Sequence, residues 1–201
     1  MLSPSLEALI KIFTKFPTIG PKTASRFAFY ILEASEEEVK NLIKAIENLR
    51  RKIKTCSLCH KTFEDGNEQL CPICQNPARN KKIICVVEKE IDLEAIEKTK
   101  AFKGFYFILG GLLPLMHKEN QNAKLEKEAE FLCQRIKKEK IEEVILALNP
   151  TLEGQNTTLW LKRKLEPLKI KISQIAKGVP LGGEIEYADE ETLIEAIANR
   201  K

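Results

Sequence analysis

Residues 83–98 read IICVVEKEIDLEAIEK, an uninterrupted apolar run followed by apolar residues at helical spacing. A short continuous run of this kind is typical of a strand that is buried on both faces of a parallel sheet. Two further runs at 105–109 and 144–148 repeat the pattern, and helical segments at 93–99 and 125–138 separate the three runs. This alternation predicts a βαβαβ unit with right-handed crossovers, and therefore an α/β fold with a largely parallel sheet.

Polar residues follow the predicted strands. A fourth strand is expected near 170–176, and in such sheets functional groups gather at the carboxyl ends of the strands. Glu88 and Asp92 follow the first strand, and the turn NPTLEG at 149–154 follows the third. A two-metal site for phosphoryl transfer needs several converging carboxylates, whereas the asparagine and threonine of this turn are weak, neutral ligands. The pattern therefore disfavours magnesium-dependent catalysis.

Two pairs of cysteines share the spacing CxxC, Cys56 with Cys59 and Cys71 with Cys74. Each CxxC turn can direct two thiolates at one ion, and two turns supply the closed tetrahedral sulfur set of structural zinc sites. We therefore predict a four-cysteine zinc finger that holds one structural zinc ion per chain. Because no ligand position remains for water, the ion is expected to be structural and not catalytic.

Other interpretations of the cysteines remain open. The four thiols could be reduced and free of metal, or His60 could replace Cys59 as a ligand. The remaining two, Cys85 and Cys133, lie in an apolar run and in a helical pattern, and are expected to be inert core residues.

The first 52 residues predict a small helical unit. One helix is expected from residue 4 to about residue 16, and a second begins at Pro21. Ser35 and Glu38 form a capping box that opens a third helix.

The turn PTIGPK at 17–22 joins the first two helices. A tight turn into a helix N-terminus exposes backbone amides and the positive end of the helix dipole, which attract a phosphate oxygen. Lys22 and Arg26 stand four residues apart and are expected to hold successive phosphates of a nucleic-acid backbone without reading its sequence, beside Ile19 and Gly20 of the turn. The alternative is a hairpin that only packs.

Charge and targeting signals are modest. The chain has 33 Lys and Arg residues against 29 Asp and Glu, and this net charge of +4 permits nucleic-acid binding without arguing for it. Its longest uncharged apolar stretch, 105–116, is too short for a membrane span, and its first residues show no export signal. A soluble, cytoplasmic protein is therefore expected. The sequence contains neither a P-loop nor a nucleophile elbow.

Taken in order, these motifs resemble the RecR family of bacterial recombination mediators. The resemblance rests on the helical hairpin, the paired CxxC motifs, VVE with a following Asp, LGG, NPTxEG and the closing stretch GVPLGGEIEYADEETL at 178–193, and it spans nearly the whole chain. It implies a helix-hairpin-helix region at 1–53, the four-cysteine zinc finger at 54–78, a Toprim domain with the parallel sheet at 79–175 and a Walker B-like tail at 176–201.

The resemblance also assigns roles to individual residues. Lys22 and Arg26 would contact DNA. The Toprim acids would be Glu88, Asp92 and Glu153, which would bind a partner protein, notably RecO, and not cleave a bond. The family further implies dimers or a ring-shaped homotetramer around DNA, which work with RecO or RecF to help load RecA at gaps.

Three departures from the family pattern stand out. The hairpin usually reads PGIGPK, but Thr18 here replaces the first glycine, which weakens the phosphate contact if that position needs a positive φ. Gln174 stands where an arginine is common. The loop after Gly111 lacks the family's usual glycines, which bears on partner contacts there.

The sequence thus leads to one principal hypothesis and two alternatives. The first is a non-enzymatic DNA-binding clamp subunit of recombinational repair. The second is a Toprim nuclease or primase that uses Glu88 and Glu153 with magnesium. The third is a zinc-stapled adaptor that binds only protein.

Overall fold

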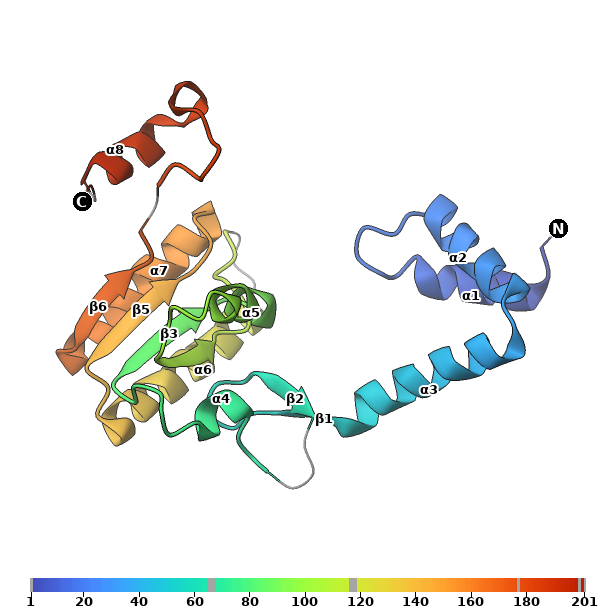
Figure 1. Ribbon diagram of the computed structural model, residues 1–201, viewed down its shortest axis with the longest axis horizontal. Coiled ribbons are helices and arrows are strands. Elements are labelled where there is room, and N and C mark those ends of the chain that lie inside the picture. Colours follow the sequence, from blue (N-terminus) through green and yellow to red (C-terminus); the bar gives the residue numbers. More distant parts are fainter. Residues whose placement is uncertain (1, 65–67, 116–118, 177, 199, 201) are drawn as a thin grey trace. The chain divides into compact units, whose positions relative to one another are not determined.

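A computed structural model describes residues 2–64, 68–115, 119–176, 178–198 and 200. The chain divides into two compact units, Met1–Ile53 and Lys54–Lys201 (Figure 1). Part of the altered loop after Gly111 lies outside the described residues. Within the described part, no helix combines the length and the apolar character that crossing a bilayer requires.

The N-terminal unit contains three helices, α1 (Pro4–Phe13), α2 (Pro21–Glu33) and α3 (Glu36–Lys52). The capping box that opens α3 is confirmed, because the Ser35 hydroxyl accepts from the Glu38 amide and the Glu38 carboxylate accepts from the Ser35 amide. The first helix ends at Phe13, three residues before the predicted end, because the chain turns there towards α2. Ala24 and Ala28 of α2 are fully buried.

The second unit is built on a four-stranded sheet, and all pairs with a described register are parallel, as predicted. Its strands are β3 (Ile83–Val87), β4 (Phe105–Ile108), β5 (Glu143–Ala147) and β6 (Lys171–Gln174), in the order β4-β3-β5-β6. The first strand of this sheet along the chain, β3, is therefore a central one, with neighbours reached by crossovers on either side. This arrangement places a topological switch point between β3 and β5.

Helices cover both faces of the sheet (Figure 1). On one face, Ile84 and Val86 pack in the larger apolar cluster with α6 (Glu119–Glu139) and α7 (Leu152–Leu165). On the other face, Val87 packs with Leu93 of α5 (Glu90–Lys98). Because alternate residues of β3 enter different clusters, the strand is apolar throughout.

The Cys85 side chain belongs to the second cluster and is only 2% exposed. Burial raises the pKa of its thiol to about 12, so this cysteine stays protonated at neutral pH. The prediction that Cys85 is a core residue is therefore confirmed, whereas Cys133 is only partly buried.

The smaller elements lie before and after the sheet. A two-stranded sheet of β1 (Ile53–Thr55) and β2 (Thr62–Glu64), together with α4 (Pro72–Gln75), carries the paired cysteines. The 3-10 helix η1 (Glu166–Leu168) precedes β6, and the tail contains η2 (Ile185–Tyr187) and α8 (Glu190–Ala198).

Truncation of Leu161 tests the assigned core. This side chain is fully buried in the larger cluster, so Leu161→Ala should lower the free energy of unfolding by about 2–5 kcal/mol. Leu159 lies on the same helix but is 55% exposed, so Leu159→Ala should change it by less than about 0.5 kcal/mol. Urea denaturation followed by the fluorescence of Trp160 measures both variants. Equal losses would contradict the assignment.

Candidate functional site

The turn before α2 exposes backbone amides. Pro21 occupies the first turn of α2 and has no N–H, and the Ala24 amide donates to Gly20 O at 2.9 Å to close that turn. The amides of Lys22 and Thr23 therefore point out of the helix end, where the dipole is positive. A Cβ placed on Gly20 would meet no atom within 4 Å, so the approach to this end is open.

The two predicted cations flank this helix end. Lys22 and Arg26 are both exposed, and their spacing of four residues places them on one side of α2. No acidic residue occupies the first turn. The structure thus joins Lys22 and Arg26 with Ile19, which is half-buried, and Gly20 in a single hairpin, although their contact with DNA stays a prediction.

Thr18 has a φ of 64°, in the left-handed region that favours glycine. This conformation costs a residue with a Cβ about 1–2 kcal/mol. Position 18 therefore has the positive φ at which replacement of glycine by threonine is expected to weaken the phosphate contact. The threonine hydroxyl donates to Pro17 O at 2.6 Å, a local contact that holds the turn.

The four cysteines of the CxxC pairs come together in the second unit. Their sulfur atoms all lie within 4.8 Å of one another, and the Sγ atoms of Cys59 and Cys71 are 3.5 Å apart. Tetrahedral zinc, with bonds of about 2.3 Å to sulfur, requires sulfurs about 3.8 Å apart. Cys56, Cys59 and Cys71 are fully buried. The donor set and its spacing therefore fit a structural zinc ion, which would cross-link the two turns.

The surroundings of Cys56 favour its thiolate form. Hydrogen bonds from the thiols of Cys59, Cys71 and Cys74 hold the pKa of Cys56 well below its usual value. The Cys71 amide also donates to Cys56 Sγ at 3.3 Å. Metal ligation requires the deprotonated form, which these two contacts stabilise at Cys56.

His60 is not one of the four ligands in this group. Its Nδ1 lies 3.1 Å from a carboxylate oxygen of Glu128, and its ring lies against Phe107 and Phe131, with centroids 5.0 and 5.2 Å away. The alternative in which His60 replaces Cys59 is therefore wrong for this structure, because Cys59 stands with the other three sulfurs.

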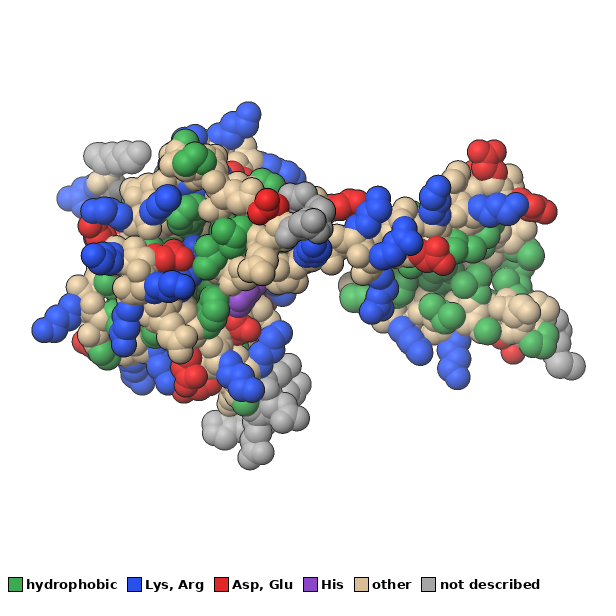
Figure 2. All heavy atoms as spheres, turned by 90° about the horizontal axis from the view of Figure 1, so that it is seen from below, with side chains coloured by type: hydrophobic (Ala, Val, Ile, Leu, Met, Phe, Trp, Pro, Cys, Tyr) green, Lys and Arg blue, Asp and Glu red, His purple; other side chains and the backbone are tan. Residues whose placement is uncertain are grey.

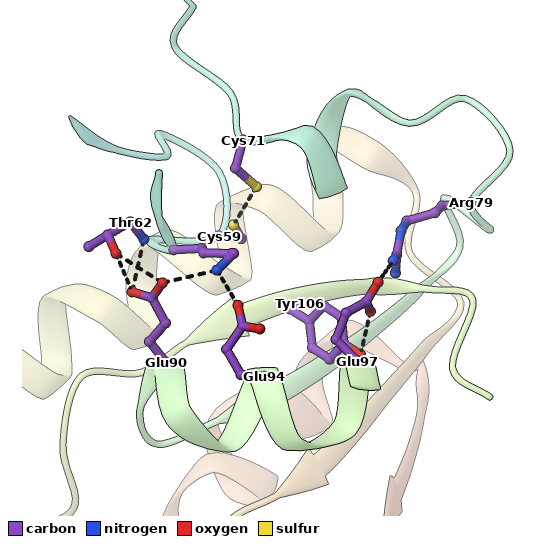
Figure 3. A network of polar contacts seen from close by, with 9 residues as sticks. Cys59, Thr62, Cys71, Arg79, Glu90, Glu94, Glu97 and Tyr106 are labelled. Atoms are coloured by element: carbon purple, nitrogen blue, oxygen red, sulfur yellow. Dashed lines mark hydrogen bonds and ion pairs between the residues drawn. The ribbon is translucent and has the colours of Figure 1, made fainter. Parts of the chain in front are cut away.

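Helix α5 braces the cysteine lobe through its acidic residues (Figure 3). Lys61 pairs with Glu94 and, at 3.0 Å, with Glu90, whose carboxylate also accepts from the Thr62 amide at 3.0 Å. Burial alone would raise the pKa of Glu90, but the hydrogen bonds from Thr62 and Lys61 outweigh it and hold the pKa below its usual value. Further along the helix, Glu97 pairs with Arg79 and accepts from the Tyr106 hydroxyl.

A buried arginine of α6 joins the same lobe to the sheet. Arg135 is 4% exposed, and its Nη1 donates to the carbonyl oxygens of Leu58 at 2.8 Å and Tyr106 at 3.0 Å. The Ile108 amide adds a bond to Cys59 O at 3.0 Å. Sequence reasoning missed Arg135, and its position among the buried residues Leu132 and Ile136 was the one available signal.

The carboxyl edge of the sheet holds Glu88 and Asn149. Glu88 is 7% exposed, and one of its carboxylate oxygens accepts from Asn149 Nδ2 at 3.3 Å. Its other oxygen lies 2.8 Å from Lys89 Nζ. Asn149 thus gives Glu88 a neutral amide donor, where a two-metal site would need a further carboxylate.

The other two predicted acids, Asp92 and Glu153, lie in the first turns of α5 and α7. The Asp92 carboxylate accepts from the Lys89 amide at 3.0 Å at the start of α5. Glu153 lies half-buried in the first turn of α7. Among the described residues, the four cysteines are the only group of three or more such ligands close enough to hold a metal, and the three acids do not form one.

Tight backbone packing shapes the NPTLEG turn. The Thr151 hydroxyl caps α7 by accepting from the Gly154 amide at 3.2 Å. A Cβ on Gly154 would lie 1.8 Å from Asn149 O, so only glycine fits there. The turn therefore brings the first turn of α7 directly against the residue that contacts Glu88.

The tail leaves apolar side chains in solvent. Ile185, Tyr187, Ile194 and Ile197 are 71%, 80%, 59% and 62% exposed, so they do not pack in the core of this chain. A cleft of about 720 Å³ lies between the tail and the carboxyl ends of β5 and β6, and its lining includes Lys162, Asp189 and Glu195.

Models of known protein families match three consecutive parts of the chain. The model for the helix-hairpin-helix of RecR matches residues 6–50, the model for a Toprim domain matches 82–176, and the model for the C-terminal part of RecR matches 178–201.

Relatives cover nearly the whole chain, and those compared are called recombination protein RecR. The one from Bifidobacterium adolescentis is 40% identical over 198 residues, which are 98% of this chain and 96% of the relative. The one from Cutibacterium acnes is 40% identical over all of this chain and 96% of its own length, and the one from Rippkaea orientalis is 39% identical over all of this chain and 98% of its own.

Metal analysis tests the cysteine centre. Native mass spectrometry should find one zinc ion per chain. Cys56→Ser and Cys74→Ser should lose the ion and several kcal/mol of stability, because metal binding in such lobes is coupled to folding and contributes about 10–16 kcal/mol in isolated zinc peptides.

Cys133→Ser is the matched control, because Cys133 lies on α6 outside the group of four. It should keep the full metal content. A native protein that binds no zinc after expression in zinc-supplemented medium would contradict the assignment.

Proposed function

Since the chain belongs to the RecR family of recombination proteins, we propose that it is a non-enzymatic, DNA-binding clamp subunit of recombinational repair. The observation that carries the proposal is the hairpin, where outward-pointing amides, an open glycine and two exposed cations gather at one helix end. Such a helix end is a ready-made seat for a phosphate. The place of action is the cytoplasm, where bacterial DNA lies.

The binding is independent of base sequence. Lys22, Arg26 and backbone amides address phosphate oxygens, which carry no sequence information. A protein that meets gaps anywhere in a genome requires contacts of this kind. If two phosphates are neutralised per protomer in a ring of four, the dependence of log K on log salt is on the order of −7 for duplex DNA.

Exposed apolar surfaces support assembly of several chains. On α3, Leu42, Ile43 and Ile46 are 44%, 52% and 54% exposed, and the tail exposes a second set. Figure 2 shows hydrophobic side chains gathered on the visible face of the N-terminal unit. Apolar surface of this extent is typical of protein interfaces. Two separate surfaces on one chain support dimers or a ring-shaped tetramer around DNA.

The acidic edge of the Toprim domain is a partner-binding surface in this proposal. Glu88 meets an amide donor where catalysis would need another carboxylate, and Asp92 caps a helix. Glu153 stands at the start of α7 beside the same turn. We assign this edge to RecO or RecF, with which the clamp helps to load RecA at gaps.

Removal of both cations tests the DNA contact. Lys22→Ala/Arg26→Ala should weaken binding to DNA by at least tenfold and reduce the salt slope by about two per protomer, because two phosphate contacts are lost. Lys11→Ala/Lys15→Ala, which removes two exposed lysines of the same unit, should change affinity far less. Fluorescence anisotropy at several salt concentrations measures both.

Undiminished affinity of the first variant would overturn the proposed contact. Absence of DNA binding in the native protein, with zinc retained, would support an adaptor instead. Magnesium-dependent cleavage that disappears in Glu88→Gln would support a nuclease and contradict the non-enzymatic proposal.

The acidic edge is tested by partner binding. Glu153→Gln should weaken binding of RecO by about tenfold, since a charged contact at an interface is lost, while DNA binding stays unchanged. Glu166→Gln removes an exposed carboxylate of η1 and serves as the control. Isothermal titration measures both variants. Equal binding by Glu153→Gln and the native protein would place the partner elsewhere.

A further inference from the structure

Helix α2 carries a shallow apolar pocket beside the phosphate seat, which is the proposed phosphate-binding site formed by Lys22, Arg26 and the amides at the start of the helix. It has a volume of about 500 Å³ and is lined by Thr23, Arg26, Phe27 and Tyr30. We propose that this pocket receives an unstacked base of the DNA strand whose phosphates Lys22 and Arg26 hold, so that the hairpin selects single-stranded DNA. The inference rests on the proposed DNA contact and adds the class of strand.

Two aromatic side chains give the pocket a stacking surface. Tyr30 is 66% exposed and Phe27 is 43% exposed, although rings of this size are usually covered. The ring of Phe27 is held edge-on by Phe13 of α1, with 5.8 Å between the centroids and 77° between the planes. The pocket is therefore supported from below by the core of the helical unit.

The aromatic residues continue the line of the cations. Lys22, Arg26 and Tyr30 follow one another at intervals of four residues and lie along one side of α2. Sites for single strands combine cations that follow the backbone with aromatic rings on which the bases stack. Lys22, Arg26 and Tyr30 supply both components in this order, first two cations and then an aromatic ring.

Charge distinguishes a nucleic acid from a second copy of the chain. The helix has no acidic residue before Glu33, so a second copy of this face would oppose Lys22 and Arg26 with like charges. A single strand supplies anions for the cations and a π-face for the rings. In a duplex the bases are already stacked and paired, and extracting one costs a few kcal/mol.

Removal of the ring tests the inference. Tyr30→Ala in the full-length chain should weaken binding of oligothymidine by about five- to 100-fold and change binding of a blunt duplex by less than about twofold. Tyr30→Phe keeps the ring and should retain both affinities. Leu159→Ala removes an exposed apolar side chain from α7 in the other unit and is the control.

Fluorescence gives a readout specific to stacking. The native chain has a single tryptophan, Trp160, in the other unit. Tyr30→Trp should therefore add a signal that oligothymidine quenches and the duplex does not. An added signal that neither DNA changes would overturn the inference.

The outcomes separate this inference from the proposed function. If Lys22→Ala/Arg26→Ala loses both DNAs while Tyr30→Ala loses neither, the phosphate seat stands and the base pocket is wrong. If Tyr30→Ala weakens both DNAs equally, the pocket does not select single strands and the inference is overturned. If Tyr30→Ala changes the mass of the DNA-free protein in light scattering, the pocket is a contact between copies and the inference is also wrong.

Discussion

Parallel pairing of β3 with a strand on either side is the constraint on which the second unit depends. Val87 lies in register with Ile108 of β4 and with Ala147 of β5, so the residues that follow all three strands reach one edge. The Gly110 amide binds Glu88 O at 3.0 Å, which extends the pairing into the loops. The backbone thus brings Glu88 and Asn149 together, and the side chains at these two positions decide whether the edge can bind a catalytic metal ion.

The cysteine lobe depends on the same sheet. Its backbone joins the end of β4 through Cys59, and Arg135 reaches it from α6. Helix α5 adds ion pairs from the other side, so three elements of the sheet domain hold one small lobe. Because such a lobe has little apolar core of its own, metal ligation and these braces have to supply its stability.

Local signals predicted most of the fold. The strand at Ile83–Val87, the start of α2 at Pro21 and the capping box at Ser35 followed from patterns within a few residues. The cysteine group could also be predicted, because its spacing leaves few other geometries. Parallel pairing then brought Glu88 to the turn that begins at Asn149, as strand order requires.

Long-range contacts could not be predicted in this way. Lys61 contacts Glu90 and Glu94, which lie 29 and 33 residues away in the sequence, and Arg135 contacts Leu58, which lies 77 residues away. No local sequence pattern predicts contacts over such distances. The left-handed Thr18 also goes against residue preference, because the turn geometry outweighs the cost of its Cβ. For the apolar tail, periodicity could not distinguish a core from an interface, since both require the same spacing.

The central claim is that DNA rests on the hairpin of the N-terminal unit, while the acidic edge of the sheet does not receive it. Hydrogen exchange of the full chain, with and without DNA, tests this claim most directly. Peptides that cover residues 17–26 should exchange more slowly in the complex, because phosphate oxygens accept from the amides at the start of α2. Peptides that cover 144–154 should not change. Protection at 144–154 with none at 17–26 would contradict the account.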